Sequence, residues 1–126
     1  MRVGYYTRSY YSLSDDDLIN LLQTSPIAIA ISSNRWELYS SGVFSCTSTA
    51  AVDHAVLLIG YTPNYWIVKN QWGTNWGENG FIRITRNPSA NCQIGTSAHI
   101  MYEGLLGVNI LYILMVMGSF IIIGMY

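Results

Sequence analysis

The chain has 126 residues and a formal net charge of −1, with six Lys and Arg against seven Asp and Glu. Duplex binding depends on clustered Lys and Arg that neutralise phosphates, so this balance argues against a nucleic-acid partner. Two cysteines are too few for a four-cysteine zinc site, and no glycine-rich phosphate-binding motif occurs. We therefore expect neither a metal nor another cofactor.

The first clear element is a short helix that begins near residue 14. Ser14 is a candidate N-cap and Asp17 stands three residues later, the spacing of a capping box. Acidic residues at 15–17 suit the positive end of the helix dipole. Pro26 ends the helix, because the residue before a proline is disfavoured in the α region.

Residues 27–31 read IAIAI, an alternation that predicts a strand with its isoleucines on one face. The two alanines leave room on the other face. Spacing alone is compatible with two interpretations, close packing of the sheet or a shallow wall of a cleft.

Two further β-rich runs, at 54–61 and 65–70, flank the turn sequence Thr62-Pro63-Asn64 and predict a hairpin. A strand is also predicted at 81–85. If the turn pairs Tyr61 with Tyr65, His54 and Asn70 become diagonal neighbours on one face, within hydrogen-bonding reach. A slip of one residue would place them on opposite faces.

A histidine beside an asparagine suits nucleophilic catalysis. A general base needs one ring nitrogen free and the other held by an acceptor, and an Asn oxygen provides that acceptor without adding charge. The alternative for His54 is a histidine that is merely satisfied at a strand end.

The sequence around this pair resembles the papain-like cysteine peptidases, which include the cathepsins. The similar runs are VDHAV at 52–56 and WIVKNQWGTNWGENGFIRI at 66–84. SPIAIAI at 25–31, LYSSGVF at 38–44 and the pair at 91–92 match the same family in the same order. The resemblance covers about residues 13–99.

The resemblance implies an α+β, mostly antiparallel fold: the barrel-like right-hand half of the papain-like fold. We expect residues 1–104 to form this C-terminal half of a peptidase domain.

The resemblance also implies roles for single residues. His54 would be the catalytic base and Asn70 its orienting partner. Trp72 would cover the bond between them, and Trp76 would line the leaving-group side of the cleft. The family most often has serine where this chain has Gln71. The implied substrate pocket is formed by Ala30, Asp53, Ala55 and Ser97, and the three small residues among them would make it roomy and apolar.

Cys46 and Cys92 match a disulfide of this half of the family. The bridge would stabilise the fold by about 4 kcal/mol in the chain-entropy model and would imply an oxidising compartment. The alternative is two unrelated thiols.

In papain-like enzymes the nucleophilic cysteine and the oxyanion glutamine lie in the N-terminal half, in a pattern that this sequence does not contain. We therefore expect a cysteine peptidase by family, acting on protein or peptide substrates, of which this chain supplies the base and its orienter. We expect the chain to be inactive without the missing half. The alternative is a non-catalytic, membrane-tethered domain that binds peptides or regulates a relative.

Residues 105–126 carry no charged side chain and are long enough, as a helix, to span a bilayer. We expect a transmembrane helix here. The alternatives are a translation of non-coding sequence and a glycolipid-anchor signal, which would need a polar spacer that is absent. With the disulfide, the expected location is a lumenal, lysosome-like or extracellular side, anchored by this helix.

Overall fold

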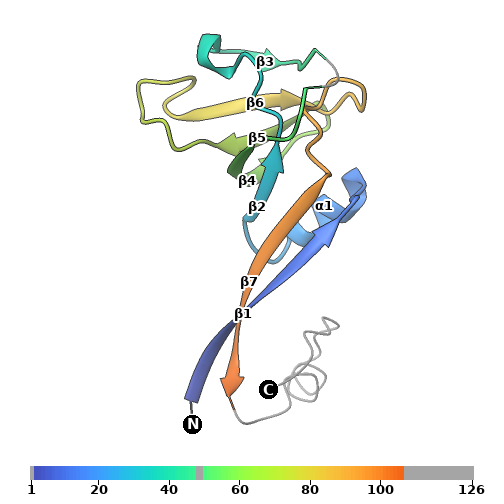
Figure 1. The fold of residues 1–126 in the computed structure, drawn as a ribbon, viewed down its shortest axis with the longest axis vertical. Helices are drawn as coiled ribbons and strands as arrows, with labels where there is room; N and C mark the ends of the chain where they lie inside the picture. The colour runs from blue at the N-terminus through green and yellow to red at the C-terminus, as the bar shows by residue number, and fades with distance from the viewer. Residues whose placement is uncertain (1, 48–49, 107–126) are drawn as a thin grey trace. The chain divides into compact units, whose positions relative to one another are not determined.

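The computed structural model describes residues 2–47 and 50–106. This part of the chain is mostly β-structure with one α-helix, as the sequence predicts (Figure 1). The elements are β1 Arg2–Tyr11, α1 Asp15–Leu22, β2 Ile27–Ile31, the 3₁₀ turn η1 Trp36–Leu38, β3 Val43–Phe44, β4 His54–Tyr61, β5 Tyr65–Lys69, β6 Phe81–Thr85 and β7 Ser97–Leu106.

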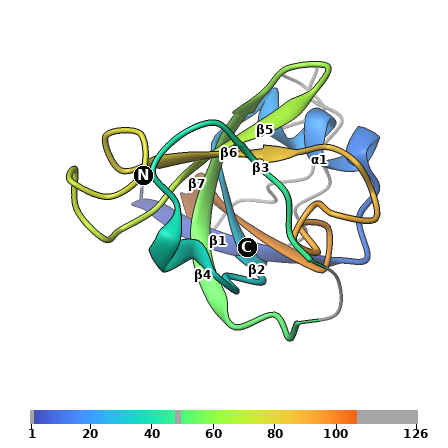
Figure 2. The ribbon, with the colours of Figure 1, turned by 90° about the horizontal axis from the view of Figure 1, so that it is seen from above.

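The strands form one sheet in the order β1-β7-β2-β4-β5-β6-β3. The pairings of β2, β4, β5, β6 and β7 are antiparallel, and the short β3 pairs with β6 in parallel. Figures 1 and 2 both show the loop between β5 and β6 extending beyond the ends of these strands.

The chain divides into two compact units. One comprises Ser9–His99 and holds α1, η1 and β2–β6 with the adjoining ends of β1 and β7. The other comprises 1–8 and 100–126, of which the structure describes the remaining parts of these two strands. All predicted site residues belong to the first unit.

Helix α1 begins as the sequence predicts. The Ser14 hydroxyl accepts a hydrogen bond from the Asp17 backbone N–H, and the Asp17 carboxylate accepts one from the Ser14 N–H, which completes the capping box. Leu18 is fully buried and anchors the helix.

The core lies on one face of the sheet. Alternate residues of β2, β4, β5 and β6 are buried, as expected where one face of each strand packs inward. This pattern confirms the prediction for the isoleucines of β2. The fully buried large side chains include Leu18, Ile27, Ile29, Ile31, Trp36, Leu58, Trp66, Val68, Ile82, Ile84 and Ile94.

The predicted hairpin is present, but its turn is one residue longer than expected. Tyr61 pairs with Trp66, not with Tyr65. The register then shifts between Leu58 and Gly60, and Leu58 pairs with Val68, as predicted. A bulge adds one residue to a strand, so the shift compensates for the longer turn. The pairing near His54 is therefore the one that the shorter turn predicted.

Strand β7 runs to Leu106, which corrects the predicted helix at its start: residues 105 and 106 are strand. The rest of that prediction, 107–126, lies outside the described residues. Within the described part of the chain, no helix has the length and apolar character needed to cross a membrane.

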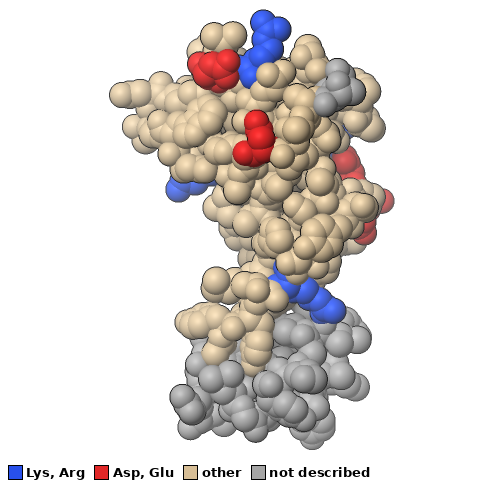
Figure 3. Space-filling view, in the orientation of Figure 1, with Lys and Arg blue, Asp and Glu red and all other residues tan. Residues whose placement is uncertain are grey.

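Charged side chains are sparse and scattered on the face drawn in Figure 3. Among the described residues, Arg83 forms an ion pair with Glu78 at 2.8 Å, and Arg86 forms one with Asp15 at 2.9 Å. The Arg86 guanidinium also lies 5.0 Å from the centroid of the Trp66 ring, so it connects α1 to the sheet.

Candidate active site

His54 and Asn70 lie at the same end of two neighbouring strands. His54 opens β4, and Asn70 directly follows β5. The two side chains meet across the hairpin, with His54 Nε2 2.9 Å from Asn70 Oδ1. The diagonal proximity expected from the hairpin is therefore present.

The orientation of the Asn70 amide determines the tautomer of His54. Asn70 Oδ1 also accepts a hydrogen bond of 2.9 Å from the Gln71 backbone N–H, which can only donate. The atom facing His54 is therefore an acceptor, and Nε2 must carry the imidazole proton. In neutral His54 the lone pair is consequently on Nδ1, the nitrogen that can receive a proton.

Three tryptophans form a cluster beside this histidine. The Trp72 ring lies 5.1 Å from the His54 ring, centroid to centroid, and Trp36 meets His54 edge-on at 5.8 Å. Trp76 stacks on Trp36 at 5.9 Å and donates its indole N–H to the Trp36 carbonyl. The Trp72 ring thus lies against the His54 ring, whereas Trp76 packs on Trp36 and Trp72.

The residues around His54 differ in how much of their surface is exposed to solvent. Trp36 is fully buried and Asn70 is 5% exposed, whereas Trp72 is 44% exposed. His54 therefore lies between one buried ring, Trp36, and one partly exposed ring, Trp72. A hydrogen bond in such a setting is stronger than one in water.

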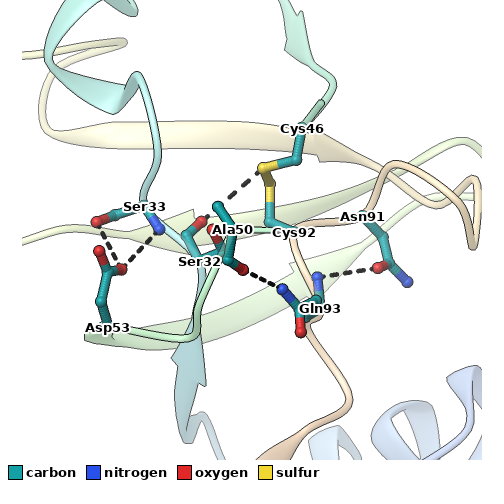
Figure 4. Close-up of a disulfide and its surroundings, with 8 residues drawn as sticks. All are labelled: Ser32, Ser33, Cys46, Ala50, Asp53, Asn91, Cys92 and Gln93. Carbon is teal, nitrogen blue, oxygen red and sulfur yellow. Dashed lines mark hydrogen bonds between the residues drawn. A yellow bond between two sulfur atoms is a disulfide. The ribbon is translucent and has the colours of Figure 1, made fainter. Parts of the chain in front are cut away.

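Asp53, which was predicted to line the substrate pocket with three small residues, has its carboxylate bonded to Ser33. Its carboxylate accepts hydrogen bonds from the Ser33 backbone N–H at 3.0 Å and from the Ser33 hydroxyl at 2.9 Å (Figure 4). The backbone N–H bond, followed by the hydroxyl bond, lowers the pKa of Asp53. Asp53 N–H also donates to Ile31 O, which fixes the residue just before His54.

The other three predicted pocket residues form a row across the sheet. Ala30 of β2 pairs with Ala55 of β4 on one side and with Ser97 of β7 on the other. Paired residues point to the same face, so the three small side chains share one surface. Ala55 also lines an open cavity of about 360 Å³, together with Ala28, Val56, Leu57, Lys69, Asn70 and Gln71.

The cysteines form the predicted disulfide, Cys46–Cys92, with their Cα atoms 5.1 Å apart. Figure 4 shows the disulfide beside Ser32, with Cys46 Sγ 3.8 Å from Ser32 O. The Ser32 N–H also donates to Cys92 O, so the bridge holds the segment whose next residue, Ser33, bonds Asp53. Both cysteines are thereby used, so none is free to act as a nucleophile.

An ion pair supports the loop that carries Trp72 and Trp76. Glu78 at its end accepts two hydrogen bonds of 2.8 Å from the Arg83 guanidinium on β6 and a further one from the Gly42 N–H. The Arg83 bonds lower the pKa of Glu78 to about 2.

The geometry shows three supporting residues that sequence reasoning did not single out as part of the site. Trp36 lies outside the runs of sequence that resemble the peptidase family. The one feature that could have pointed to it was its place among several aromatic residues. Ser33 was invisible because its bond to Asp53 spans 20 positions. Gln71 was noted only as a variant, yet its amide bonds Ala55 O at 2.9 Å.

The described residues contain no group of three or more His, Cys, Asp or Glu side chains that could hold a metal ion. What the arrangement offers is a histidine with a defined tautomer, a neutral partner that holds it, and a nearby surface of small side chains. Chemically this is a positioned proton acceptor.

Comparison with known proteins places the sequence in a protein family. The sequence profile described as "Papain family cysteine protease" matches residues 2–102. A cathepsin L-like protein of Caenorhabditis elegans is 46% identical over 110 residues, which is 76% of this chain and 32% of that protein. A cathepsin L-like proteinase of Fasciola hepatica is 41% identical over 105 residues, 77% of this chain and 32% of that protein.

Solved structures agree with this similarity. Bromelain of Ananas comosus, determined in complex with the E64 inhibitor, superposes with a TM-score of 0.66 at 33% identity and covers 81% of this chain. The match covers 50% of the bromelain chain. The present chain thus spans about a third of the length of these curated relatives and half of the bromelain structure.

Proposed function

The chain belongs to the papain family of cysteine proteases, and from this premise we propose that it supplies the acid–base half of a peptidase site. His54 is the general base and Asn70 holds its ring. Trp72 shields the bond between them. The observation that carries this proposal is the hydrogen bond of His54 Nε2 to an Asn70 oxygen whose acceptor character is fixed by Gln71 N–H.

The proposed chemistry follows from the tautomer. His54 Nδ1 takes the proton of a cysteine thiol, and the resulting thiolate attacks the carbonyl carbon of a peptide bond. The imidazolium then gives its proton to the leaving amine as the C–N bond breaks. Water attacks the thioester that remains and gives a proton to His54, and the acid product leaves as the thiolate is restored. A neutral asparagine suits this cycle, because the thiolate already balances the imidazolium.

The small-residue row is the proposed substrate surface. Ala30, Ala55 and Ser97 place little bulk and no charge on their face of the sheet, which suits an apolar side chain of a protein or peptide substrate. Asp53 is proposed as a support of His54 and not as part of this surface, because its carboxylate is engaged by Ser33.

The nucleophile must come from outside these 126 residues, because both cysteines are in the disulfide. We propose that a second papain-like half carries the cysteine and the oxyanion glutamine, and that this chain alone does not hydrolyse peptides. The same lack of a thiol favours the second candidate, a non-catalytic peptide-binding domain. The intact His–Asn bond favours catalysis, since binding alone does not require it.

The experiment is reconstitution. The chain is co-refolded with the half of bromelain that it does not match, and hydrolysis of a fluorogenic peptide is measured. The proposal predicts no hydrolysis by either part alone and hydrolysis by the complex. A folded complex that binds the peptide without cleaving it would favour the second candidate.

The proposed location is lumenal or extracellular, because a buried disulfide indicates an oxidising compartment. Membrane attachment through the uncharged residues 107–126 is proposed from sequence alone, since a helix of that length would span about 30 Å. In that case, the protein should stay in the membrane pellet at alkaline pH. Release into the supernatant would contradict attachment.

A further inference from the structure

Strand β4 continues past the end of its pairing with β5. The last pair between the two strands is Leu57 with Lys69, and His54 lies three residues further along β4. On its other edge, β4 stays paired with β2 as far as Ile31 and His54. The catalytic end of β4 is therefore held by the regular ladder on the β2 side only.

Gln71 bonds this end of β4 on the β5 side. Its side-chain Nε2 donates to Ala55 O at 2.9 Å, and its backbone N–H donates to Asn70 Oδ1 at the same distance. One residue therefore bonds the carbonyl next to His54 and the amide that holds the His54 ring.

We propose that Gln71 is a positioning residue, whose side chain replaces the missing rung between β4 and the segment after β5. This inference rests on the proposed function of His54 and Asn70. Through this side-chain rung, the backbone beside His54 and the oxygen of Asn70 are held by the same residue. Gln71 then sets the distance between the β4 backbone beside His54 and the Asn70 amide. The end of β4 does not have to keep this distance without a partner on the β5 side.

The position of Gln71 explains why a side chain is needed here. Beyond Lys69 the chain leaves the strand and enters the loop that carries Trp72. The backbone of this loop no longer runs beside β4, so an amide on a flexible stem has to reach the Ala55 carbonyl. A shorter or apolar side chain would leave that carbonyl to water.

The test uses the full chain with 15N-labelled histidine and two variants, Gln71→Ala and Gln71→Leu. The first removes the stem and the amide, and the second keeps apolar bulk without a donor. NMR measures the tautomer of His54 and the exchange rate of its Nε2 proton. Gln23→Ala is the matched control, because Gln23 Nε2 also donates to a backbone carbonyl, that of Ile19, at 3.0 Å.

We expect both Gln71 variants to speed exchange of the His54 Nε2 proton about fivefold, the ratio that one net hydrogen bond supplies. The tautomer should stay the same, because the Gln71 backbone N–H still donates to Asn70 Oδ1 in both variants. His99, the second histidine, and the Gln23→Ala variant should show no such change in exchange rate. An unchanged exchange rate of the His54 Nε2 proton in Gln71→Ala would overturn the proposal. So would rescue by Leu, which would assign the effect to bulk.

This readout separates the two proposals. It reports the geometry of His54 without any proteolysis, so an inactive complex with bromelain would leave it intact. In an active complex, Gln71→Ala should lower kcat about fivefold and leave KM unchanged. A change confined to KM would count against a positioning role.

Discussion

At the scale of single residues, the orientation of the site depends on a group that can donate a hydrogen bond but cannot accept one. The Gln71 backbone N–H can only donate, so it fixes the orientation of the Asn70 amide. The Asn70 oxygen in turn fixes the tautomer of His54. The residue types at positions 54 and 70 and the chemistry they suit could be predicted from the sequence. The direction of the Asn70 amide could not, because it depends on the backbone conformation of the next residue.

The support of Asp53 gives a prediction at the same scale. Ser33→Ala removes the hydroxyl bond and keeps the backbone N–H bond, so the pKa of Asp53 should rise toward its ordinary value without reaching it. The lowered pKa means that this contact stabilises the fold above pH 4 and is lost as the pH falls through the lowered value. Titration of the Asp53 carboxyl by 13C NMR measures the change. An unchanged pKa would show that the hydroxyl contributes nothing.

At the scale of elements, the strands with clear alternation could be predicted, and those without it could not. β2 could be predicted from its alternation, and β4 and β5 from β-rich runs that flank a turn sequence, and in the structure the buried residues of β2, β4, β5 and β6 do alternate. β1 and β7 were missed, since their sequences mix aromatic, polar and small residues without that period. The bulge in β4 was equally hidden, because no residue type at Ile59 marks it.

Two glycines of the loop after β5 give an element-scale prediction. A Cβ on Gly77 would lie 2.7 Å from the Phe81 carbonyl oxygen, whereas a Cβ on Gly73 would meet no described atom within 4 Å apart from its own chain neighbours. Both have positive φ, so each Ala substitution should cost about 1–2 kcal/mol from backbone strain. Gly77→Ala should cost about 1–3 kcal/mol more because of the clash. Urea unfolding followed by tryptophan fluorescence compares them, and equal losses would contradict the clash.

The Glu78–Arg83 pair at the end of this loop gives a pH-dependent prediction. The pKa of Glu78 is lowered from 4.5 to about 2, so the pair stabilises the fold fully above pH 4.5 and is lost as the pH falls toward 2. The side chains are about a third exposed, so Glu78→Gln should cost only about 0.5–1 kcal/mol at pH 7. Unfolding at pH 7 and pH 3 measures this. Glu37→Gln, at an exposed residue of η1, should have no effect at either pH.

At the scale of the whole molecule, the disulfide joins segments far apart in the sequence. It closes a loop of 46 positions and holds the stretch that leads through Ser32 to Asp53. The pairing was implied by the family resemblance, but the connection to the residue before His54 became visible only in the structure. Distant hydrogen bonds of this kind leave no local pattern in a sequence.

Removal of this bridge should cost about 4 kcal/mol of the free energy of unfolding, because the unfolded chain gains the entropy of the opened loop. The double variant Cys46→Ala with Cys92→Ala is compared with the oxidised chain by urea unfolding at pH 7. The reduced, unaltered chain is the control and should unfold like the double variant. A loss below about 1 kcal/mol would show that hydrogen bonds alone hold the segment.

The most direct test of the account is kcat/KM of the complex reconstituted with the bromelain half, for unaltered His54 and for His54→Ala. Without a base the thiol is not deprotonated in the site, so the account predicts a loss of at least about a thousandfold. The variant must bind the bromelain half as the unaltered chain does, which is checked by gel filtration. A complex of the His54→Ala variant that hydrolyses the peptide at the unaltered rate would contradict the claim that this chain contributes the general base.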